Sequence, residues 1–445
     1  MAPYLTDWRG RYRGEAACVA RPASTREVRA TVQWAGVHRV AIVPQGGNTG
    51  LAGGATPNAG TRASVDTRPQ VVLSLNRMDA VRNVDRIGMT LEVEAGCIVE
   101  HAKKVAARAG RYLPISFGAQ GSATVGGMIS TNAGGSNALR HGTVRQFVLG
   151  VEAVLADGSV VGELGGLRKD NAGWDWKQLF IGSEGTLGVV TAAVLRLLPL
   201  PSERALAFVA LESPEAALAL LERFQDQMGD AVTAFELMSG PTLDLVIRHL
   251  GAPSPLNPTP WCVLIEVADS AGDLRRRFEA ALAAAAEHGS IEDTALAEST
   301  EHARRFWTLR ESIAEAERRQ QPSAKHDVSV PVTRVPAFLR EVETALAQLG
   351  PGLQIIAFGH LGDGNLHYNV AGQAAGIADA DITRVVHDVV AGFGGSISAE
   401  HGIGQYRIAE LGRLKPVAEL ALLRRLKCAL DPDELFNPGK VLPEP

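Results

Sequence analysis

The sequence has few cysteines, no long apolar run and no visible secretory signal. Four cysteines are spread over 445 residues without a C-x-x-C pair, which argues against a disulfide framework or a zinc knot. They are therefore expected to be free thiols in a reducing compartment. No stretch reaches the roughly 18 apolar residues of a membrane-spanning helix. The N-terminus lacks the apolar core of a signal peptide, so the cytoplasm is the predicted location.

Charge of one sign is not concentrated anywhere in the chain. The formal net charge is -5, and no long block of like charges occurs. This argues against a nucleic-acid partner or a polybasic membrane patch. The basic run Arg275–Arg277 lies in an Ala-rich helical stretch and is predicted to be a solvated helix face.

Two common nucleotide-binding motifs are missing as well. No G-x-G-x-x-G opens a helix with an acidic residue about 20 positions later, so a Rossmann nicotinamide site is not expected. No Walker A sequence is present either. Any nucleotide cofactor must therefore be held by backbone loops of another fold.

What the chain does contain is an ordinary globular composition, with 46% hydrophobic and 21% charged residues. Its length suits two domains. The first half is rich in glycine, and strands are predicted at residues 40–43, 71–75, 90–93, 148–155 and 188–198. Helices are predicted over 24–35, with Ser24 or Thr25 as the N-cap, and over 100–109.

The pattern changes near residue 200, where a domain boundary is predicted. Long helices are expected over 214–228, 273–288 and 300–319, separated by strands at 261–267, 328–330 and 353–358. This alternation indicates an antiparallel sheet backed by helices. The proline-rich segment 253–260 is predicted to be a surface loop.

Three glycine-dense segments lie in the first half, at residues 44–50, 118–135 and 181–188. Without a Cβ, glycine lets backbone N–H groups approach and face an anion, and interleaved Ser, Thr and Asn add short donors. Three such segments can surround a pyrophosphate and the polar edge of a ring system. Tight turns in a β-rich domain are the simpler explanation of any single segment.

Two histidines flank an Asp-Gly pair in the second half, in the sequence His360-Leu-Gly-Asp-Gly-Asn-Leu-His367. Asp-Gly between apolar residues predicts a two-residue hairpin turn. His360 would then stand directly opposite His367, with Cβ atoms about 5 Å apart, and Asn369 would share that face. Two facing imidazoles can chelate a divalent ion such as zinc.

A third ligand is available in Glu400, within Ser398-Ala-Glu-His-Gly402. Two histidines and one carboxylate leave coordination positions open for a substrate, as in a catalytic metal site. Hydrogen bonding of these histidines within the core is the alternative interpretation.

The three glycine segments, in this order, resemble the FAD domain of the vanillyl-alcohol oxidase (PCMH-type) flavoprotein superfamily. The resemblance implies an α+β fold, with a PCMH-type FAD-binding domain of two α+β subdomains over 1–200 and a tail over 431–445 that returns to the flavin. It implies that 44–49 lie at the pyrophosphate, and that 118–135 and 184–189 line the isoalloxazine and adenosine parts. Asn48 stands where several members carry a histidine bonded to the flavin, so non-covalent FAD is expected. The implied cofactor-binding residues are Pro44, Gly46, Gly47, Asn48, Thr49, Gly50, Gly118, Gly121, Ser122, Thr124, Gly126, Gly127, Asn132, Gly134, Glu184, Gly185, Gly188, Val189 and Asn437.

The second half resembles the C-terminal substrate domain of FAD-linked D-2-hydroxy-acid dehydrogenases, through residues 360–367 and 398–404. The resemblance implies an α+β substrate- and metal-binding domain over 201–430. It implies His360, His367 and Glu400 as metal ligands, and His401 as a substrate-contacting base near the flavin. Substrate contacts are further implied for Arg310, Lys325 and Asn369. Ala314 and His326 depart from the pattern of the D-2-hydroxyglutarate dehydrogenases and leave the substrate open.

These features together imply oxidation of a D-2-hydroxy acid, with hydride transfer to FAD and proton transfer to His401. Lys325, as partner of a distal carboxylate, favours D-2-hydroxyglutarate as substrate and 2-oxoglutarate as product. D-lactate or glycolate, a flavin-free metal-dependent hydrolase and a non-catalytic FAD-binding subunit of a larger complex are the alternatives. Zinc is the favoured ion and manganese the alternative, since ligand type alone does not choose. An electron-transfer flavoprotein or a quinone is expected as electron acceptor, and the family suggests a homodimer.

Overall fold

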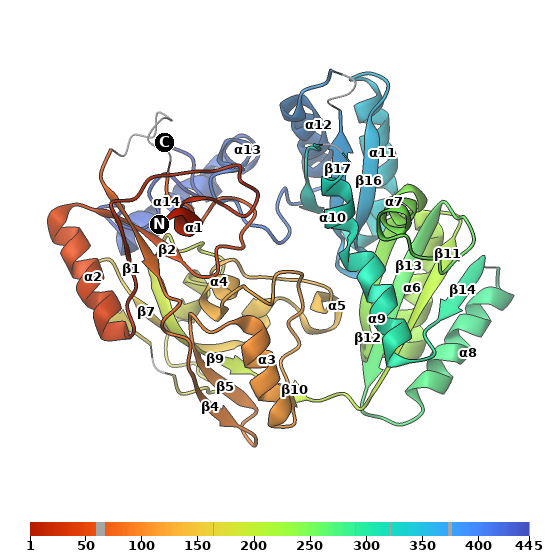
Figure 1. Ribbon diagram of the computed structural model, residues 1–445, viewed down its shortest axis with the longest axis horizontal. Helices are drawn as coiled ribbons and strands as arrows, with labels where there is room; N and C mark the ends of the chain where they lie inside the picture. The colour runs from red at the N-terminus through yellow and green to blue at the C-terminus, as the bar shows by residue number, and fades with distance from the viewer. Residues whose placement is uncertain (59–66, 163, 290, 321, 373–375, 445) are drawn as a thin grey trace. The chain divides into compact units, whose positions relative to one another are not determined.

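The computed structural model describes residues 1–58, 67–162, 164–289, 291–320, 322–372 and 376–444. The chain forms two compact units (Figure 1). Unit 1 comprises residues 1–134, 143–200 and 400–445, and unit 2 comprises residues 135–142 and 201–399. The segment 135–142 and the return of the chain to unit 1 at residue 400 are features that the ranges predicted from sequence do not contain.

Unit 1 contains two main sheets. A parallel sheet has the order β1-β3-β2, and an antiparallel sheet has the order β4-β5-β9-β7-β8. The strands are β1 (Cys18–Ala20), β2 (Ala41–Gln45), β3 (Gln70–Ser74), β4 (Val81–Asp85), β5 (Thr90–Glu94), β6 (Arg111–Tyr112), β7 (Val148–Val154), β8 (Val160–Val161), β9 (Val189–Arg196) and β10 (Leu198–Pro199). The helices are α1 (Ala2–Leu5), α2 (Thr25–His38), α3 (Val99–Arg108), α4 (Val125–Ser130), α13 (Ile408–Leu414) and α14 (Val417–Leu430).

Helix α2 illustrates how local sequence sets these elements. The Ser24 side chain accepts a hydrogen bond from the backbone N–H of Glu27, which caps the helix as predicted. Val28, Val32 and Ala35 recur at helical spacing and are fully buried in the core of unit 1.

Unit 2 is built on one seven-stranded antiparallel sheet with the order β14-β11-β13-β12-β16-β17-β15, which confirms the predicted sheet type. Its strands are β11 (Glu203–Leu211), β12 (Val232–Ser239), β13 (Trp261–Asp269), β14 (Asp293–Leu296), β15 (Asp327–Ser329), β16 (Gln354–His360) and β17 (Asn365–Ala371). Its helices are α5 (Ala138–His141), α6 (Pro214–Met228), α7 (Gly240–Leu250), α8 (Leu274–Glu287), α9 (Thr300–Glu311), α10 (Ile313–Arg318), α11 (Val335–Ala347) and α12 (Asp379–Gly392).

A separate apolar core fixes the helices α7, α9 and α10 against one face of this sheet. Phe306 of α9 and Ile313 of α10 pack there with Met238 of β12 and Phe358 of β16. The single helix predicted over 300–319 is wrong in one respect, because Ser312 ends α9 and begins α10. Both helices contribute apolar side chains to the same core.

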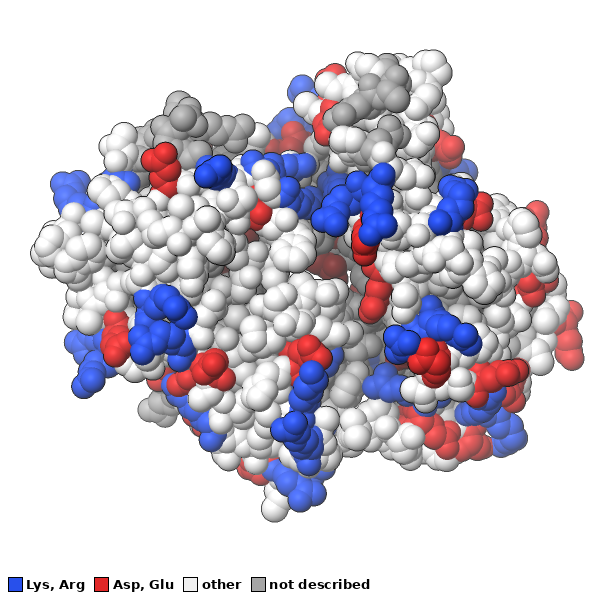
Figure 2. All heavy atoms as spheres, viewed as in Figure 1, with Lys and Arg blue, Asp and Glu red and all other residues white. Residues whose placement is uncertain are grey.

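The remaining global expectations concern cysteines, charge and membrane helices. All four cysteines are free thiols, as predicted. Among the described residues, no helix combines the length and apolar character needed to cross a bilayer. Figure 2 shows basic and acidic side chains side by side over the surface formed by α8 and α9. Arg275 pairs there with Glu279 and Arg276 with Asp273, so the basic run is a solvated face as predicted.

Candidate active site

The first two glycine segments lie against each other in unit 1. A Cβ on Gly46 would come within 2.1 Å of Thr124 Oγ1, and one on Gly47 within 2.0 Å of the Ser122 carbonyl oxygen. Real Cβ atoms do not approach so closely, so a side chain at Gly47 would collide with backbone and one at Gly46 would displace the Thr124 hydroxyl group. The loop that follows β2 and the loop that precedes α4 thus touch through their backbones.

The third glycine segment joins the same cluster. The backbone N–H groups of Gly182 and Glu184 donate to the carbonyl oxygens of Ile129 and Ser130, at 3.0 and 2.8 Å. A Cβ on Gly185 would lie 3.3 Å from Pro44, at the end of the first segment. The structure therefore brings together all three segments that the sequence marked as a candidate cofactor cradle.

Several implied cofactor residues have definite local partners, whereas others face open space. The Asn132 side chain accepts hydrogen bonds from Thr143 Oγ1 and the Arg145 backbone N–H, both at 3.0 Å. The Asn48 side chain donates to the carbonyl oxygens of Pro3 and Thr6, at 3.2 and 2.8 Å, which ties the first segment to the N-terminus. A Cβ at Gly50 or Gly118 would meet no atom within 4 Å.

The other implied residues of these segments occupy the loops and their adjoining elements. A Cβ on Gly126 would contact Ala95, and the backbone N–H of Gly127 donates to the Thr124 hydroxyl group. Val189 is the first residue of β9.

Glu184 holds the segment that follows His401. Its carboxylate accepts hydrogen bonds from the backbone N–H groups of Ile403 and Gly404, at 2.7 and 2.9 Å. Burial raises the pKa of Glu184, although these two hydrogen bonds oppose the increase. A Cβ on Gly402 would lie 2.7 Å from the same carboxylate. The Glu184 carboxylate thus holds the backbone next to His401, the predicted base, in unit 1.

The C-terminal tail contacts the same region of unit 1. Asn437 donates from its side chain to the Glu184 carbonyl oxygen at 2.8 Å, and its backbone N–H donates to Ile42 of β2. The Lys440 ammonium donates to the carbonyl oxygens of Gly54 and Thr56, at 2.9 and 2.7 Å. Burial lowers the pKa of Lys440 to about 7, against the opposing charge of Glu184.

In unit 2, the predicted histidines lie on the sheet face that α7, α9 and α10 cover. His360 ends β16 and His367 lies in β17, with ring centroids 5.8 Å apart. A ring nitrogen of one lies within 4.8 Å of a ring nitrogen of the other. Asn369 lies two residues beyond His367 and shares the face, as predicted.

The predicted hairpin register is wrong. His360 pairs with Asn365, and His367 pairs with Phe358. The connection is a four-residue loop in which Leu361–Asp363 form a 3-10 turn, instead of a two-residue turn at Asp363-Gly364. The Asp363 carboxylate caps this loop by accepting from the Asn365 backbone N–H at 3.0 Å. Because the register shifts by two residues, both histidines stay on one face and meet diagonally.

A fully buried carboxylate, Glu236, lies directly opposite His360 on β12. One oxygen contacts His360 Nδ1 at 2.6 Å, and the other accepts from Arg310 Nε and Nη2, both at 2.8 Å. Burial opposes ionisation, but the charges of His360 and Arg310 outweigh it and lower the pKa of Glu236 to about 2. Arg310 itself is buried, so its ion pair with Glu236 lies in the interior of unit 2.

A second buried carboxylate, Glu317 of α10, anchors the other implied substrate residues. It contacts Lys325 Nζ at 2.6 Å and accepts from Asn369 Nδ2 at 3.0 Å and Ser323 Oγ at 2.5 Å. The Asn369 side-chain oxygen accepts from the His326 backbone N–H at 3.2 Å. The orientation of the Asn369 amide is therefore fixed from both ends.

The two departures from the family pattern lie in different surroundings. His326 is buried, and its ring contacts the Tyr368 carbonyl oxygen and Thr383 of α12 at 2.7 and 3.2 Å. Its side chain thus lies against α12. Ala314 is exposed on α10.

The two glutamates were missed by the sequence interpretation, although each carries a signal. Glu236 interrupts a strand in which every residue from Val232 to Ser239 is buried, and an isolated charge there requires a partner. Glu317 lies four residues after Ile313, on the buried stripe of α10.

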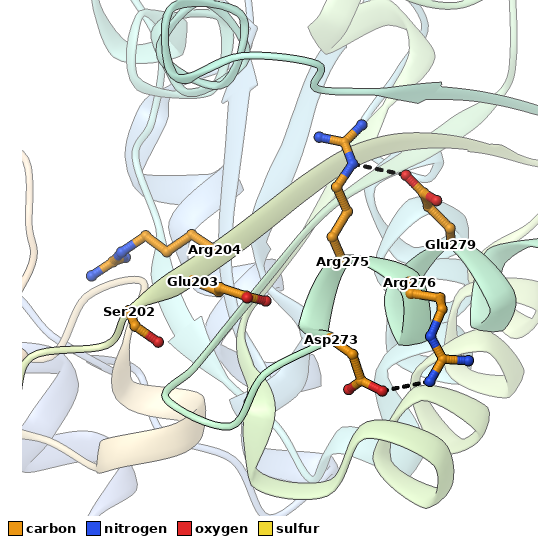
Figure 3. A pocket seen from close by; sticks show the side chains of 7 residues that line it. All are labelled: Ser202, Glu203, Arg204, Asp273, Arg275, Arg276 and Glu279. Atoms are coloured by element: carbon orange, nitrogen blue, oxygen red, sulfur yellow. Dashed lines mark hydrogen bonds and ion pairs between the residues drawn. The ribbon is translucent and has the colours of Figure 1, made fainter.

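A surface hollow of about 600 Å³ in unit 2 has a different character (Figure 3). Its charged side chains are satisfied locally. Arg275 donates to Glu279 at 2.8 Å, and the Leu274 backbone N–H donates to Glu203 at 2.9 Å. It contains none of the implied site residues.

Family comparisons agree with this arrangement. Residues 16–162 match the FAD binding domain family, and residues 200–441 match the C-terminal domain of FAD linked oxidases. The fold is similar to p-cresol methylhydroxylase (TM-score 0.75, 15% identity, 99% of this chain and 92% of that one). It is also similar to 4-ethylphenol oxidase from Gulosibacter chungangensis (TM-score 0.70, 17% identity, 96% and 89%). The protein is thus a member of the FAD linked oxidases, with the fold of p-cresol methylhydroxylase.

Relatives that are similar in sequence identify the family more narrowly. The chain is 37% identical to the mitochondrial D-2-hydroxyglutarate dehydrogenase of Bos taurus, over 100% of this chain and 80% of that protein. It is 38% identical to the D-2-hydroxyglutarate dehydrogenase of Xanthomonas citri pv. viticola (98% and 92%) and 32% identical to that of Stutzerimonas stutzeri (98% and 93%). The chain belongs to the FAD-linked D-2-hydroxy-acid dehydrogenases and is a FAD-dependent dehydrogenase.

The residues present fit both implied groups. For FAD, the glycine segments of unit 1 approach each other so closely that a Cβ at Gly46 or Gly47 would collide. For a divalent ion, His360 has its Nδ1 on a carboxylate, which leaves Nε2 as the atom able to coordinate. His367 supplies a second imidazole on the same face.

Proposed function

We propose that this dehydrogenase oxidises D-2-hydroxyglutarate to 2-oxoglutarate. The observation that carries the proposal is that two cationic side chains, Arg310 and Lys325, and two histidines lie in the same region of unit 2. A substrate with two carboxylates suits two cations. Relatives 32–38% identical over the whole chain carry that activity in their names.

The proposed ligands of a divalent ion, zinc or manganese, are His360, His367 and Glu400. Glu400 directly follows Ala399, whose backbone N–H donates to the Asp327 carbonyl oxygen at 3.1 Å. Asp327 pairs with His367 in the sheet, so unit 2 ends, at residue 399, beside the strand pair that carries His367. When bound, such an ion lowers the pKa of a coordinated hydroxyl group.

The protein groups have separate proposed roles. Arg310 uses two of its five N–H donors on Glu236 and keeps three for a substrate carboxylate. Lys325 and Asn369, both held by Glu317, orient the distal end of the substrate. His401 takes the hydroxyl proton as general base. FAD, held non-covalently, accepts the hydride when bound.

Other predicted properties stay predictions. They are the domain ranges 1–200, 201–430 and 431–445, the individual cofactor contacts, the electron-transfer flavoprotein or quinone acceptor, a homodimer and a cytoplasmic location. Oxidation of D-lactate or glycolate by the same residues is the second candidate, because Ala314 offers no hydroxyl group where D-2-hydroxyglutarate dehydrogenases often carry one.

The decisive experiment is anaerobic addition of D-2-hydroxyglutarate to the purified protein while the visible flavin band is followed. Rapid bleaching that a chelator abolishes and that zinc or manganese restores is the expected result. Bleaching by D-lactate but not by D-2-hydroxyglutarate would identify D-lactate as the substrate and leave the proposed mechanism unchanged. Bleaching without steady-state turnover on an artificial dye would favour a subunit that needs a partner.

A further inference from the structure

Glu236 contacts both a proposed metal ligand, His360, and the proposed substrate clamp, Arg310. It lies in the middle of β12 with no exposed surface. Oε1 faces His360 Nδ1, and Oε2 faces Arg310. Both contacts lie inside unit 2. A buried charge without a partner costs free energy, and these two contacts offset that cost for Glu236.

We propose that Glu236 is a positioning residue that couples the divalent-ion site to the carboxylate clamp. The inference rests on the proposed function, because it assigns His360 to the ion and Arg310 to the substrate. Glu236 itself touches neither in this assignment. It sets the orientation of one side chain for each.

On the metal side, the contact selects a tautomer. A carboxylate at 2.6 Å from Nδ1 favours a proton on that nitrogen, so in the neutral imidazole that binds an ion the lone pair is on Nε2. The carboxylate also increases the basicity of the imidazole and restricts its rotation, as carboxylate–histidine pairs do in metal sites. His367 has a weaker equivalent, since Asp327 lies 3.7 Å from its Nδ1.

On the substrate side, the contact fixes the plane of the guanidinium group. Nε and Nη2 both donate to Oε2, and the group also lies over the Phe358 ring, 4.9 Å from its centroid. These two restraints set the direction of the remaining donors before a substrate arrives. Moving Glu236 would therefore disturb the ion and the substrate together.

The test uses Glu236→Gln in the FAD-loaded full-length protein. A glutamine has one acceptor oxygen and one donor nitrogen, so it can satisfy only one of the two partners. Zinc affinity, measured alone by competition with a chromophoric chelator, should fall by roughly 10–100-fold, the usual effect of losing such a partner. KM for D-2-hydroxyglutarate at saturating zinc should rise as well.

Glu317→Gln is the matched control. Glu317 is equally buried, but it contacts Lys325, Asn369 and Ser323 instead of a histidine. It should raise KM without changing zinc affinity. Equal losses of zinc affinity in both variants would indicate general destabilisation and overturn the coupling.

Glu236→Asp covers a failure of the glutamine variant to fold. Its carboxylate is shorter by one methylene group and cannot span both partners, so the same losses are expected in milder form. Unchanged zinc affinity in a folded, flavin-loaded Glu236 variant overturns this inference alone. A wild-type protein that binds neither zinc nor manganese would instead overturn the proposed function.

Discussion

The two units build their candidate sites in opposite ways. Unit 1 uses backbone: three loops far apart in sequence touch where glycines remove side chains, as Gly46 does beside Thr124. Unit 2 uses side chains: neighbouring strands of a regular sheet present Glu236, His360 and His367 on one face. The candidate site in unit 1 should therefore be sensitive to added side-chain volume. The candidate site in unit 2 should be sensitive to the identity and charge of single side chains.

The contrast extends to the surroundings of three cations, although unit 1 also holds an ion pair between Lys427 and the buried Asp431. In unit 1, Lys440 donates to two backbone carbonyl oxygens and to Asn437. In unit 2, Lys325 and Arg310 each contact a buried carboxylate. A polar loop accommodates a charge with dipoles, whereas a dry sheet face needs a counter-charge.

The largest effect is expected at His401, whose neighbours belong to the unit 1 backbone but whose proposed role concerns the substrate. His401→Asn should lower kcat by about 10²–10⁴-fold, the usual contribution of a general base. Flavin content and spectrum should stay unchanged. Stopped-flow bleaching of the flavin is the measurement, and the exposed His38→Asn on α2 is the control. Undiminished bleaching would remove His401 from the mechanism.

A glycine substitution tests the backbone side of the comparison. In Gly47→Ala the Cβ would lie 2.0 Å from the Ser122 carbonyl oxygen, so one of the two loops must move. Overpacking of this kind costs about 1–3 kcal/mol, and the protein should lose flavin and melt at a lower temperature.

Flavin per polypeptide and the thermal midpoint measure this effect. Gly36→Ala in α2 is the matched control, since its Cβ meets no atom within 4 Å and alanine favours a helix interior. Full flavin occupancy in Gly47→Ala would show that the touching loops do not form the cofactor cradle.

These features differ in how far the sequence could predict them. The glycine segments were predictable because their residue type is a direct consequence of close backbone approach. Helix α6 was predicted at its observed limits, since Ser213 caps it and Pro214 begins it. Local chemistry thus set both features.

The hairpin register and the buried glutamates needed tertiary information. Asp363-Gly364 suits a two-residue turn, yet a Cβ at Gly364 would lie 2.1 Å from the Val330 carbonyl oxygen, so the loop is shaped by a distant strand end. Glu236 meets Arg310 across 74 positions, a pairing that no local pattern specifies.

A glutamate substitution tests the side-chain half. Glu317→Gln removes the counter-charge of Lys325 and one anchor of Asn369. We expect the preference for D-2-hydroxyglutarate over D-lactate, as a ratio of kcat/KM values, to fall by roughly tenfold, or about 1.4 kcal/mol. Only the diacid has a distal carboxylate for Lys325 to hold. Ser323→Ala, which keeps the lysine contact, is the control. An equal loss with both acids would reduce Glu317 to a structural role.

The smallest effect concerns Lys440 and the pH dependence of stability. Burial lowers its pKa from the usual 10.5 to about 7 in the folded protein. Between these values the unfolded chain binds more protons than the folded one, so the free energy of unfolding should rise with pH. Below about pH 7 both states carry the proton, and the cost of burial is complete.

In Lys440→Met the dependence of the free energy of unfolding on pH should be weaker, while the contribution of other groups to that dependence persists. Thermal midpoints of both proteins from pH 7 upward measure the difference. Parallel pH profiles would mean that the carbonyl oxygens of Gly54 and Thr56 keep the ammonium group charged, and that backbone dipoles compensate a buried charge as fully as the carboxylates of unit 2 do.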